Sequence, residues 1–475
     1  MEPQHLRFGG GATETVLNPL VLLLVLILGV LVLVWPRRKI IAPVIAAFVL
    51  IPTDQVLLIG GLHFPMLRFL ALFGIARLAW EKISSKGKIF SGGLNKIDIA
   101  VISFALVTAL AGTLLFRELG ALIFQLGNVY TIFSVYFLLR YLIRDERDII
   151  CAFRALAYVA AVVAVVMAWE VATGRNPYAI LGGARASDYA TAMARGDRFR
   201  ARGCFEHPIL AGTFGAILVP LFVLLWQNSK RNRVIAVIGI VSATVITLAS
   251  NSSTPILAYA GGVLAVCMWP LRNQMRIVRW AIVTTVVCLH LVMKAPVWHL
   301  IARIDVSGGS SSYHRFMVVD QCIRHFSDWW LVGVKSTFEW GWDMWDTANQ
   351  YVAICDTSGL LPFVLFIATI VYGFKYLGKA MRIAATKQHQ LFLWALGSAL
   401  FANVVAFMGI SYADQIIVIW YGLLASISAA AILRPKAVSI HSYAAERSNA
   451  NDWIVQTAKL KGKAATDPIA ASHWT

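Results

Sequence analysis

The amino-acid sequence predicts an all-α fold, a polytopic bundle of about 12–13 transmembrane helices with two large outer loops. The first observation is composition: 59% of the 475 residues are hydrophobic and 14% are charged. This balance excludes an ordinary soluble domain and a disordered chain. The second is length, because apolar runs of about 18 or more residues recur along the chain, and each can cross a bilayer core. The third is that basic residues gather in every second connection between these runs.

The apolar runs divide the chain into groups of spans separated by two loops. The N-terminal group, residues 1–172, is expected to hold spans at 17–35, 40–60, 62–80, 98–115, 119–140 and 150–172. A basic outer loop, 173–207, leads to the central group of residues 208–296, with spans at 208–226, 233–250, 254–270 and 278–296. A longer outer loop covers 297–349, and the C-terminal group of residues 350–434 holds spans at 350–374, 391–409 and 413–433. Residues 435–475 are polar and alanine-rich, which predicts a weakly ordered cytoplasmic tail.

The net charge of +18 is explained by membrane topology, so we predict no nucleic-acid partner. Lysine and arginine fill alternate connections, whereas the short connections between them carry almost no cation other than Arg117. By the positive-inside rule the basic connections face the cytoplasm, which puts the N-terminus outside and the C-terminus in the cytoplasm. The basic connections lie at 37–39, 82–96, 140–147, 230–233, 272–279, 375–387 and 434–436.

The first outer loop carries cations that topology does not explain. The stretch RGDRFRARGCFEHPILAG, residues 195–212, begins with four arginines in eight residues: Arg195, Arg198, Arg200 and Arg202. Guanidinium groups bind phosphate oxygens in a bidentate manner, so one interpretation is an anion site. The other is a solvated loop whose arginines pair with its own carboxylates or with lipid headgroups. Glu170, near the outer end of its span, is expected to hold one of these arginines.

The second outer loop combines cations with aromatic residues. A short helix is predicted within 309–327, because serines that can cap it precede apolar residues at helical spacing. Arg315 lies in its first turns and Arg324 near its end. Trp342 and Trp345 follow near the end of the loop. Their rings suit the apolar faces of sugars, but tryptophan is also typical of membrane interfaces, and both interpretations stay open.

The six cysteines are scattered, without a CxxC motif or zinc spacing. No metal site is therefore predicted. Cys204 and Cys322 fall in the two outer loops, where a disulfide between them is chemically feasible.

Three motifs within residues 195–375 resemble the O-antigen ligase and Wzy-type polysaccharide polymerase superfamily. In the first, an arginine stands three residues before a glycine and is followed by an aromatic residue, a proline and a small residue. The matching residues are Arg200, Gly203, Phe205, Pro208 and Ala211. In the second, Arg315 matches an arginine of the loop helix, and DWWLVGVKSTF is a looser match to a glycine-containing stretch. In the third, Asn349 and Gly359 match a His-Asn pair followed by a glycine.

The sequence departs from this family at two places. The serine-rich turn ASNSSTPILA, 249–258, lacks an arginine that often follows the serine, and Ala348 stands where the family has the histidine proposed as catalytic base. Asp346 is the expected substitute, provided that 344–348 are non-helical and the span begins near Asn349. Asp343, Glu206 and His207 are alternatives, and so is a mechanism without an enzymic base.

The resemblance implies a metal-independent membrane glycosyltransferase of a bacterial inner membrane, without a cofactor. It would act as a polymerase on oligosaccharides linked to polyprenyl diphosphate, with a chain-length regulator as a candidate partner. Arg200, Arg315 and Arg202 would stabilise the leaving diphosphate, and Asp346 would accept the proton of the attacking hydroxyl. The other candidate substrate contacts are Glu206, His207, Arg324, Asn349, Trp342 and Trp345.

Two alternatives remain. A ligase would pass the same donor to another acceptor, such as lipid A–core or a protein. A transporter or flippase of lipid-linked glycans would need polar or broken helices near the midplane and often internal repeats. The cations lie in loops rather than in mid-span, which favours the enzyme.

Overall fold

The computed structural model describes residues 15–60, 62–84, 89–182, 193–195, 198–226, 230–303 and 311–432. Within these ranges the regular secondary structure is helical apart from two short hairpins, which confirms the all-α prediction. The predicted tail, 435–475, and residues 183–192 of the basic loop lie outside the described residues.

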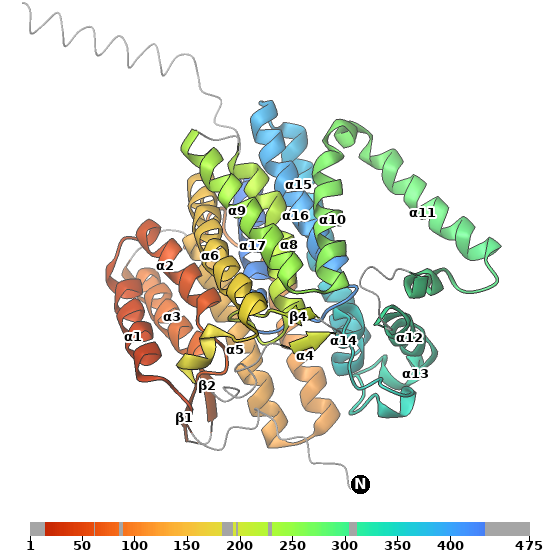
Figure 1. Cartoon of the computed structure of the whole chain (residues 1–475), viewed down its shortest axis with the longest axis horizontal. Coiled ribbons are helices and arrows are strands. Elements are labelled where there is room, and N and C mark those ends of the chain that lie inside the picture. Colours follow the sequence, from red (N-terminus) through yellow and green to blue (C-terminus); the bar gives the residue numbers. More distant parts are fainter. Residues whose placement is uncertain are drawn as a thin grey trace, which may run out of the picture. The chain divides into compact units, whose positions relative to one another are not determined.

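The helices follow the predicted groups (Figure 1). The N-terminal group comprises α1 (Pro19–Val34), α2 (Arg37–Leu50), α3 (Met66–Ser84), α4 (Lys96–Phe116), α5 (Leu119–Leu142) and α6 (Glu146–Thr173). The central group comprises α8 (Pro208–Leu225), α9 (Lys230–Ala249), α10 (Ser253–Cys267) and α11 (Met275–Val292). The longer loop holds α12 (Ser311–Arg324) and α13 (Phe326–Trp329), followed by α14 (Gln350–Ser358), α15 (Leu360–Ile383), α16 (Lys387–Ala406) and α17 (Ile416–Ile432). Short 3-10 helices are η1 (Pro177–Leu181), η2 (Trp269–Gln274), η3 (Val297–Arg303) and η4 (Phe338–Trp340).

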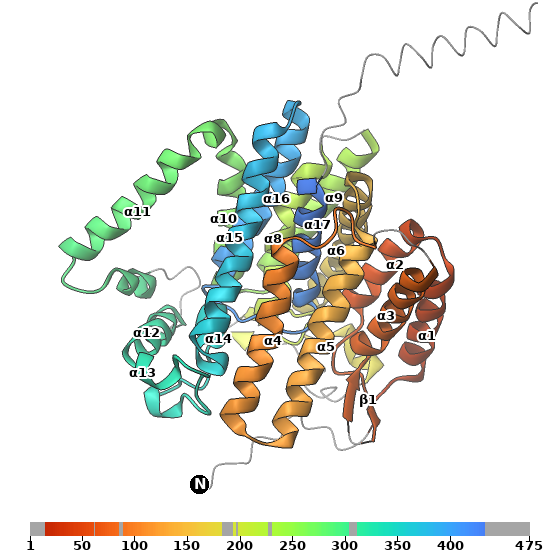
Figure 2. The ribbon, with the colours of Figure 1, turned by 180° about the vertical axis from the view of Figure 1, so that it is seen from behind.

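The long helices other than α11 run side by side, as a membrane bundle requires (Figures 1 and 2). Among the described residues, eight helical segments are long and apolar enough to span a membrane, and α1, α10 and α17 are apolar but shorter. Every predicted span range contains a helix. The chain is therefore a multi-pass membrane protein. The short loop helix predicted within 309–327 is confirmed as α12.

The predicted span at 40–60 is wrong in its second half. Helix α2 ends at Leu50, and the chain then forms an antiparallel hairpin of β1 (Val56–Ile59) and β2 (Leu62–Pro65). Pro52 has no backbone N–H and disfavours a helical residue before it, which explains the end of α2. The hairpin also occupies the start of the range predicted for the next span, so α3 begins only at Met66.

The predicted span at 350–374 is broken near its start. Gly359 separates α14 from α15 and adopts a φ of +88°, a conformation that other residues rarely take. A Cβ there would lie 2.6 Å from the carbonyl oxygen of Leu331, so the neighbouring loop also requires glycine. The spanning helix therefore starts at Leu360, and α14 is a separate short helix before it.

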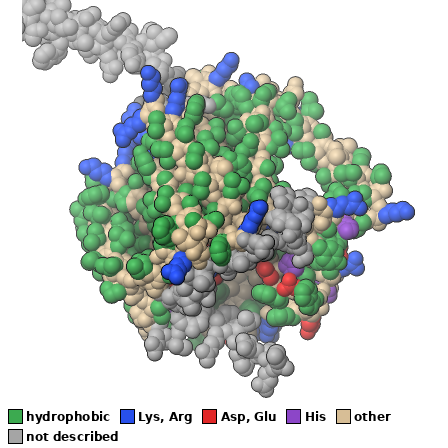
Figure 3. Space-filling view, viewed as in Figure 1, with side chains coloured by type: hydrophobic (Ala, Val, Ile, Leu, Met, Phe, Trp, Pro, Cys, Tyr) green, Lys and Arg blue, Asp and Glu red, His purple; other side chains and the backbone are tan. Residues whose placement is uncertain are grey.

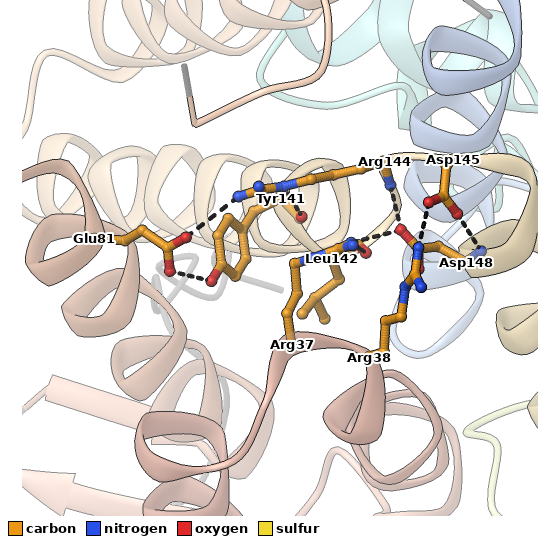
Figure 4. Close-up of polar contacts among 8 residues, drawn as sticks. All are labelled: Arg37, Arg38, Glu81, Tyr141, Leu142, Arg144, Asp145 and Asp148. Carbon is orange, nitrogen blue, oxygen red and sulfur yellow. Dashed lines mark hydrogen bonds and ion pairs between the residues drawn. The ribbon is translucent and has the colours of Figure 1, made fainter. Parts of the chain in front are cut away.

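Two connections predicted to lie on the same side of the membrane meet at one end of the bundle (Figure 4). Arg37 Nη1 lies 2.6 Å from Asp148 Oδ2, and Arg38 Nε lies 3.0 Å from Asp148 Oδ1. Arg38 also pairs with Asp145, and Arg144 lies 3.5 Å from Glu81. These pairs join the α1–α2 connection, the end of α3 and the α5–α6 connection. We call this the basic end. The opposite end, formed by the β1–β2 hairpin and by the described residues within 174–207 and 293–349, is called the loop end.

Helices α8 and α11 differ sharply in how they pack. Helix α8 is almost wholly buried and contacts α6, α9, α10 and α16. Small residues permit this close packing, because a Cβ on Gly215 would lie 2.7 Å from the carbonyl oxygen of Ala243. By contrast, no residue of α11 is buried, and Figure 3 shows an opening between α11 and the bundle. The fold therefore centres on α8, whose first residue follows the basic loop directly.

Candidate functional site

The candidate site is built on the serine-rich turn between α9 and α10. Ser250, Ser252 and Ser253 are all buried, and Asn251 adopts a positive φ of 43° that reverses the chain. Ser250 donates to the carbonyl of Thr247 (2.7 Å), and Ser252 donates to the carbonyl of Ser250 (2.8 Å). Ser252 is the N-cap residue of α10. The turn therefore presents ordered hydroxyl groups at a helix N-terminus, where the helix dipole favours negative charge.

Arg200 reaches this turn from the basic loop. It ends strand β4 (Arg198–Arg200), which pairs with β3 (Met193–Arg195) in a small hairpin that the sequence did not predict. Its Nη2 donates to Ser252 Oγ (2.8 Å), and its Nε donates to the carbonyl of Ser250 (3.5 Å). The backbone N–H of Ala201 donates to the carbonyl of Ala249 (3.0 Å), which fixes the end of the strand on the turn.

Arg315 reaches the same turn from the other loop. It lies in the first turns of α12, and its Nη1 donates to Ser253 Oγ (3.0 Å). The structure thus brings together Arg200 and Arg315, which the sequence places in two different loops (Figure 1 shows β4, α10 and α12). Two guanidinium groups on adjacent serines form a concentrated positive field, suited to a phosphate or diphosphate.

Glu170 and Arg202 hold the basic loop in place from inside the fold. Glu170 Oε2 accepts hydrogen bonds from the backbone N–H groups of Arg202 (3.0 Å) and Gly203 (2.9 Å). Glu170 therefore holds an arginine of the loop, as predicted, but through its backbone. The side chain of Arg202 is buried, and its Nη1 donates to the carbonyl of Glu206 (3.4 Å). This contact lies within the basic loop and not on the serine turn.

His207 caps helix α8 and is neutral at pH 7. Its Nδ1 accepts a hydrogen bond from the backbone N–H of Ile209 (3.2 Å). Burial, and then the charges of Arg200 and Arg202, lower the pKa of His207 to about 4. A neutral imidazole that accepts at Nδ1 carries its proton on Nε2. In this state His207 is a hydrogen-bond donor at Nε2, which argues against its role as a base.

The loop before α14 meets one of the two backbone conditions of the Asp346 hypothesis, because it is not helical, whereas the spanning helix begins at Leu360 and not near Asn349. Residues 346–349 are non-helical after a turn at 342–345, and α14 begins at Gln350. Asn349 is its N-cap, with Oδ1 accepting from the N–H of Tyr351 (2.9 Å) and Nδ2 donating to the carbonyl of Met408 (3.2 Å). Asp346 is exposed, and within the described part of the chain no ion pair joins it to Arg200 or Arg315.

The remaining predicted residues lie on the surface of the longer loop. Trp342 and Trp345 are 93% and 64% exposed. Arg324 pairs with Asp320 on its own helix (Nε to Oδ2, 2.6 Å), away from the first turns of α12. The carbonyl of Asp343 is 2.8 Å from Nε2 of His314, the residue before Arg315 on α12.

Sequence reasoning missed the connection between α16 and α17, residues 407–415. The backbone N–H of Gln350 donates to the carbonyl of Phe407 (2.9 Å), and Thr254 Oγ1 donates to the carbonyl of Gly409 (3.1 Å). At the other end of the connection, Gln415 Nε2 donates to the carbonyl of Cys204 (2.8 Å). This connection therefore joins α14, the serine turn and the basic loop. The sequence carried one signal for this connection, the polar pair Asp414 and Gln415 between two apolar runs.

Sequence reasoning also missed Asp356 in α14. Its side chain is buried, and its Oδ1 has no hydrogen-bond partner among the described residues. Burial raises the pKa of Asp356 to about 7, although a hydrogen bond with Thr347 acts in the opposite direction. A buried carboxyl group of this kind is a candidate for proton transfer.

The sequence left open whether Cys204 and Cys322 pair, and the structure does not join them. Both residues are buried free cysteines. The thiol of Cys204 donates to the carbonyl of Val49 (3.2 Å), at the end of α2. Cys322 lies instead in a hydrophobic cluster between α12 and α14.

In comparisons with known proteins, no family model and no curated protein matches this chain.

Proposed function

We propose that the chain is a polysaccharide polymerase, a membrane glycosyltransferase of the O-antigen ligase and Wzy-type superfamily that it resembles. The observation that carries this proposal is the convergence of Arg200 and Arg315 on one serine turn. Both arginines match family motifs, and they come from loops that are far apart in the sequence. Transfer from a lipid diphosphate needs positive charge at the leaving group, and this pair supplies it.

In the proposed reaction, a hydroxyl oxygen of the acceptor glycan attacks the anomeric carbon of the donor. The bond from that carbon to the polyprenyl diphosphate breaks, and negative charge develops on the leaving oxygen. Arg200 and Arg315 stabilise this charge, while Ser252 and Ser253 hold the two guanidinium groups in place. The hydroxyl proton passes to a carboxylate, for which Asp346 is the proposed acceptor.

The proposed location is a bacterial inner membrane with the loop end outside. The contacts between the α1–α2 and α5–α6 connections support this orientation, because both basic connections lie at the same end of the bundle. Labelling of single engineered cysteines in intact spheroplasts tests it. Residue 186 should react with an impermeant maleimide and residue 231 should not. The reverse pattern would contradict the orientation.

The enzymatic proposal is tested on purified protein in detergent. The substrate is the lipid-linked repeat unit extracted from a host strain that lacks this protein. We expect longer glycan chains together with free polyprenyl diphosphate, both resolved by mass spectrometry. A transporter would yield neither product, since no compartments exist in detergent. A ligase would transfer the glycan to an added second acceptor but would not lengthen it.

Arg200→Lys tests the role of the guanidinium group. Lysine keeps the charge but cannot form the bidentate fork, so we expect the transfer rate to fall at least about tenfold. Arg198→Lys is the matched control, because Arg198 lies on the same strand with its side chain exposed. It should retain near-normal activity. Equal losses in the two variants would refute a specific phosphate contact at Arg200.

A further inference from the structure

Two cysteines face each other across the contact between the loop helix α12 and helix α14. Cys322 and Cys355 are each 5% exposed and belong to one buried cluster. Val318 and Cys322 are four residues apart on one face of α12, and Val352 and Cys355 are three residues apart on one face of α14. These two faces form the contact, and both thiols are part of it.

The chemistry of the two side chains supports a direct contact. The pKa of the Cys355 thiol is raised, first by a hydrogen bond with the Cys322 thiol and then by burial. The Trp329 indole N–H donates to the carbonyl of Cys322 (2.7 Å), which fixes the end of α12 against the cluster. Neither thiol is used in the proposed transfer reaction.

We propose that Cys322 and Cys355 form a disulfide in the mature protein. This inference rests on the proposed orientation, in which the loop end faces the oxidising side of the membrane. The oxidant is a protein disulfide of a thiol–disulfide oxidoreductase. The thiolate of one cysteine attacks this disulfide and forms a mixed disulfide, and the second thiolate then displaces the oxidant. The oxidant leaves as a dithiol, having accepted two electrons and two protons.

The bond would fix the position of an arginine of the candidate site. Arg315 and Cys322 lie seven residues apart on α12, about two helical turns. A covalent link from α12 to α14 therefore limits how far Arg315 can move from Ser253. It also fixes α12 against the helix that follows the proposed proton acceptor, Asp346.

The number of free thiols tests the proposal. Cells that produce the full-length protein are quenched in acid, and the denatured protein is treated with a maleimide–polyethylene glycol reagent. We expect four of the six cysteines to react without a reductant and all six to react after reduction. In Cys322→Ser all five remaining cysteines should react under both conditions. In the control variant Cys204→Ser the difference of two thiols should persist.

Six reactive thiols without reductant would overturn the proposal. Treatment of the purified protein with oxidised glutathione then identifies the cause. Formation of the bond only in vitro would contradict the oxidising location, and no bond in either case would contradict the pairing. Neither outcome bears on the enzymatic proposal, which the glycan-transfer assay measures separately.

Discussion

Asp356→Asn should change the pH dependence of stability in a direction that the structure fixes. Burial raises the pKa of Asp356 to about 7, from an ordinary value near 4 in the unfolded chain. The folded protein therefore binds the proton more tightly than the unfolded chain does. Protonation of Asp356 therefore contributes its full amount to the free energy of unfolding below the pKa of the unfolded chain, near 4. This contribution is lost as the pH rises through about 7.

The size of the effect follows from the two pKa values. Between pH 5 and pH 8, titration of Asp356 should lower the free energy of unfolding by about 3 kcal/mol, at about 1.4 kcal/mol per pKa unit. A chain of this length has an unfolding entropy of about 1 kcal/mol/K, so the melting temperature should fall by about 3 °C. Asparagine does not titrate, so the variant should lose this component of the pH dependence.

The assay compares the melting temperatures of the wild-type protein and the variant in the same detergent at pH 5 and pH 8. His207 acts in the opposite direction, because its lowered pKa makes the folded state lose stability as the pH falls below about 6.5. The wild-type profile alone therefore does not isolate Asp356, but the difference between the two proteins does. Identical pH dependence in both proteins would refute the raised pKa.

Two further predictions concern the loops. Glu170→Leu should lower the free energy of unfolding by about 2–4 kcal/mol, because the buried N–H groups of Arg202 and Gly203 lose their acceptor. Thermal unfolding measures this loss of stability, and Glu170→Gln is the milder control. If Glu170→Leu destabilises the protein no more than Glu170→Gln does, Glu170 is not the acceptor on which the basic loop depends. Asp346→Asn should abolish glycan transfer with the protein still inserted, and Ala348→His should partly restore it. Normal product from Asp346→Asn would exclude this base.

The fold class and the loop helix were predictable because their signals are local. Apolar length predicts a membrane helix, and alternate basic connections predict the order of the spans. Serine caps and helical spacing predicted α12 with Arg315 in its first turns, as the structure has it. The end of α2 was a missed local signal, since Pro52 follows it closely. An apolar run that continues past a proline resembles a longer span.

The contacts of the candidate site could not be predicted in the same way. Membership of a loop does not determine which turn an arginine reaches, so only the family resemblance linked Arg200 to Arg315. The burial of Asp356 depends on how the loop around Val334 and Thr347 meets α14, and the pairing of Cys322 depends on how α12 packs on α14. No segment encodes these contacts alone. Asp356 carried one usable signal, an acid close to a glycine at the start of a predicted span.

The bundle, rather than the loops, sets the position of the serine turn. Helix α8 approaches the turn at Gly212, where a Cβ would lie 2.6 Å from the Cβ of Ser250 and 2.7 Å from Pro255 Cγ. Gly212→Ala should therefore displace the turn, and with it the anchor of Arg200, at a stability cost of about 1–3 kcal/mol. The rate of glycan transfer per folded molecule should also fall, because small displacements of a charge-stabilising group slow the reaction. Gly378→Ala is the matched control, because a Cβ there meets no atom within 4 Å. If Gly212→Ala keeps full activity per folded molecule, the serine turn does not position the catalytic arginine.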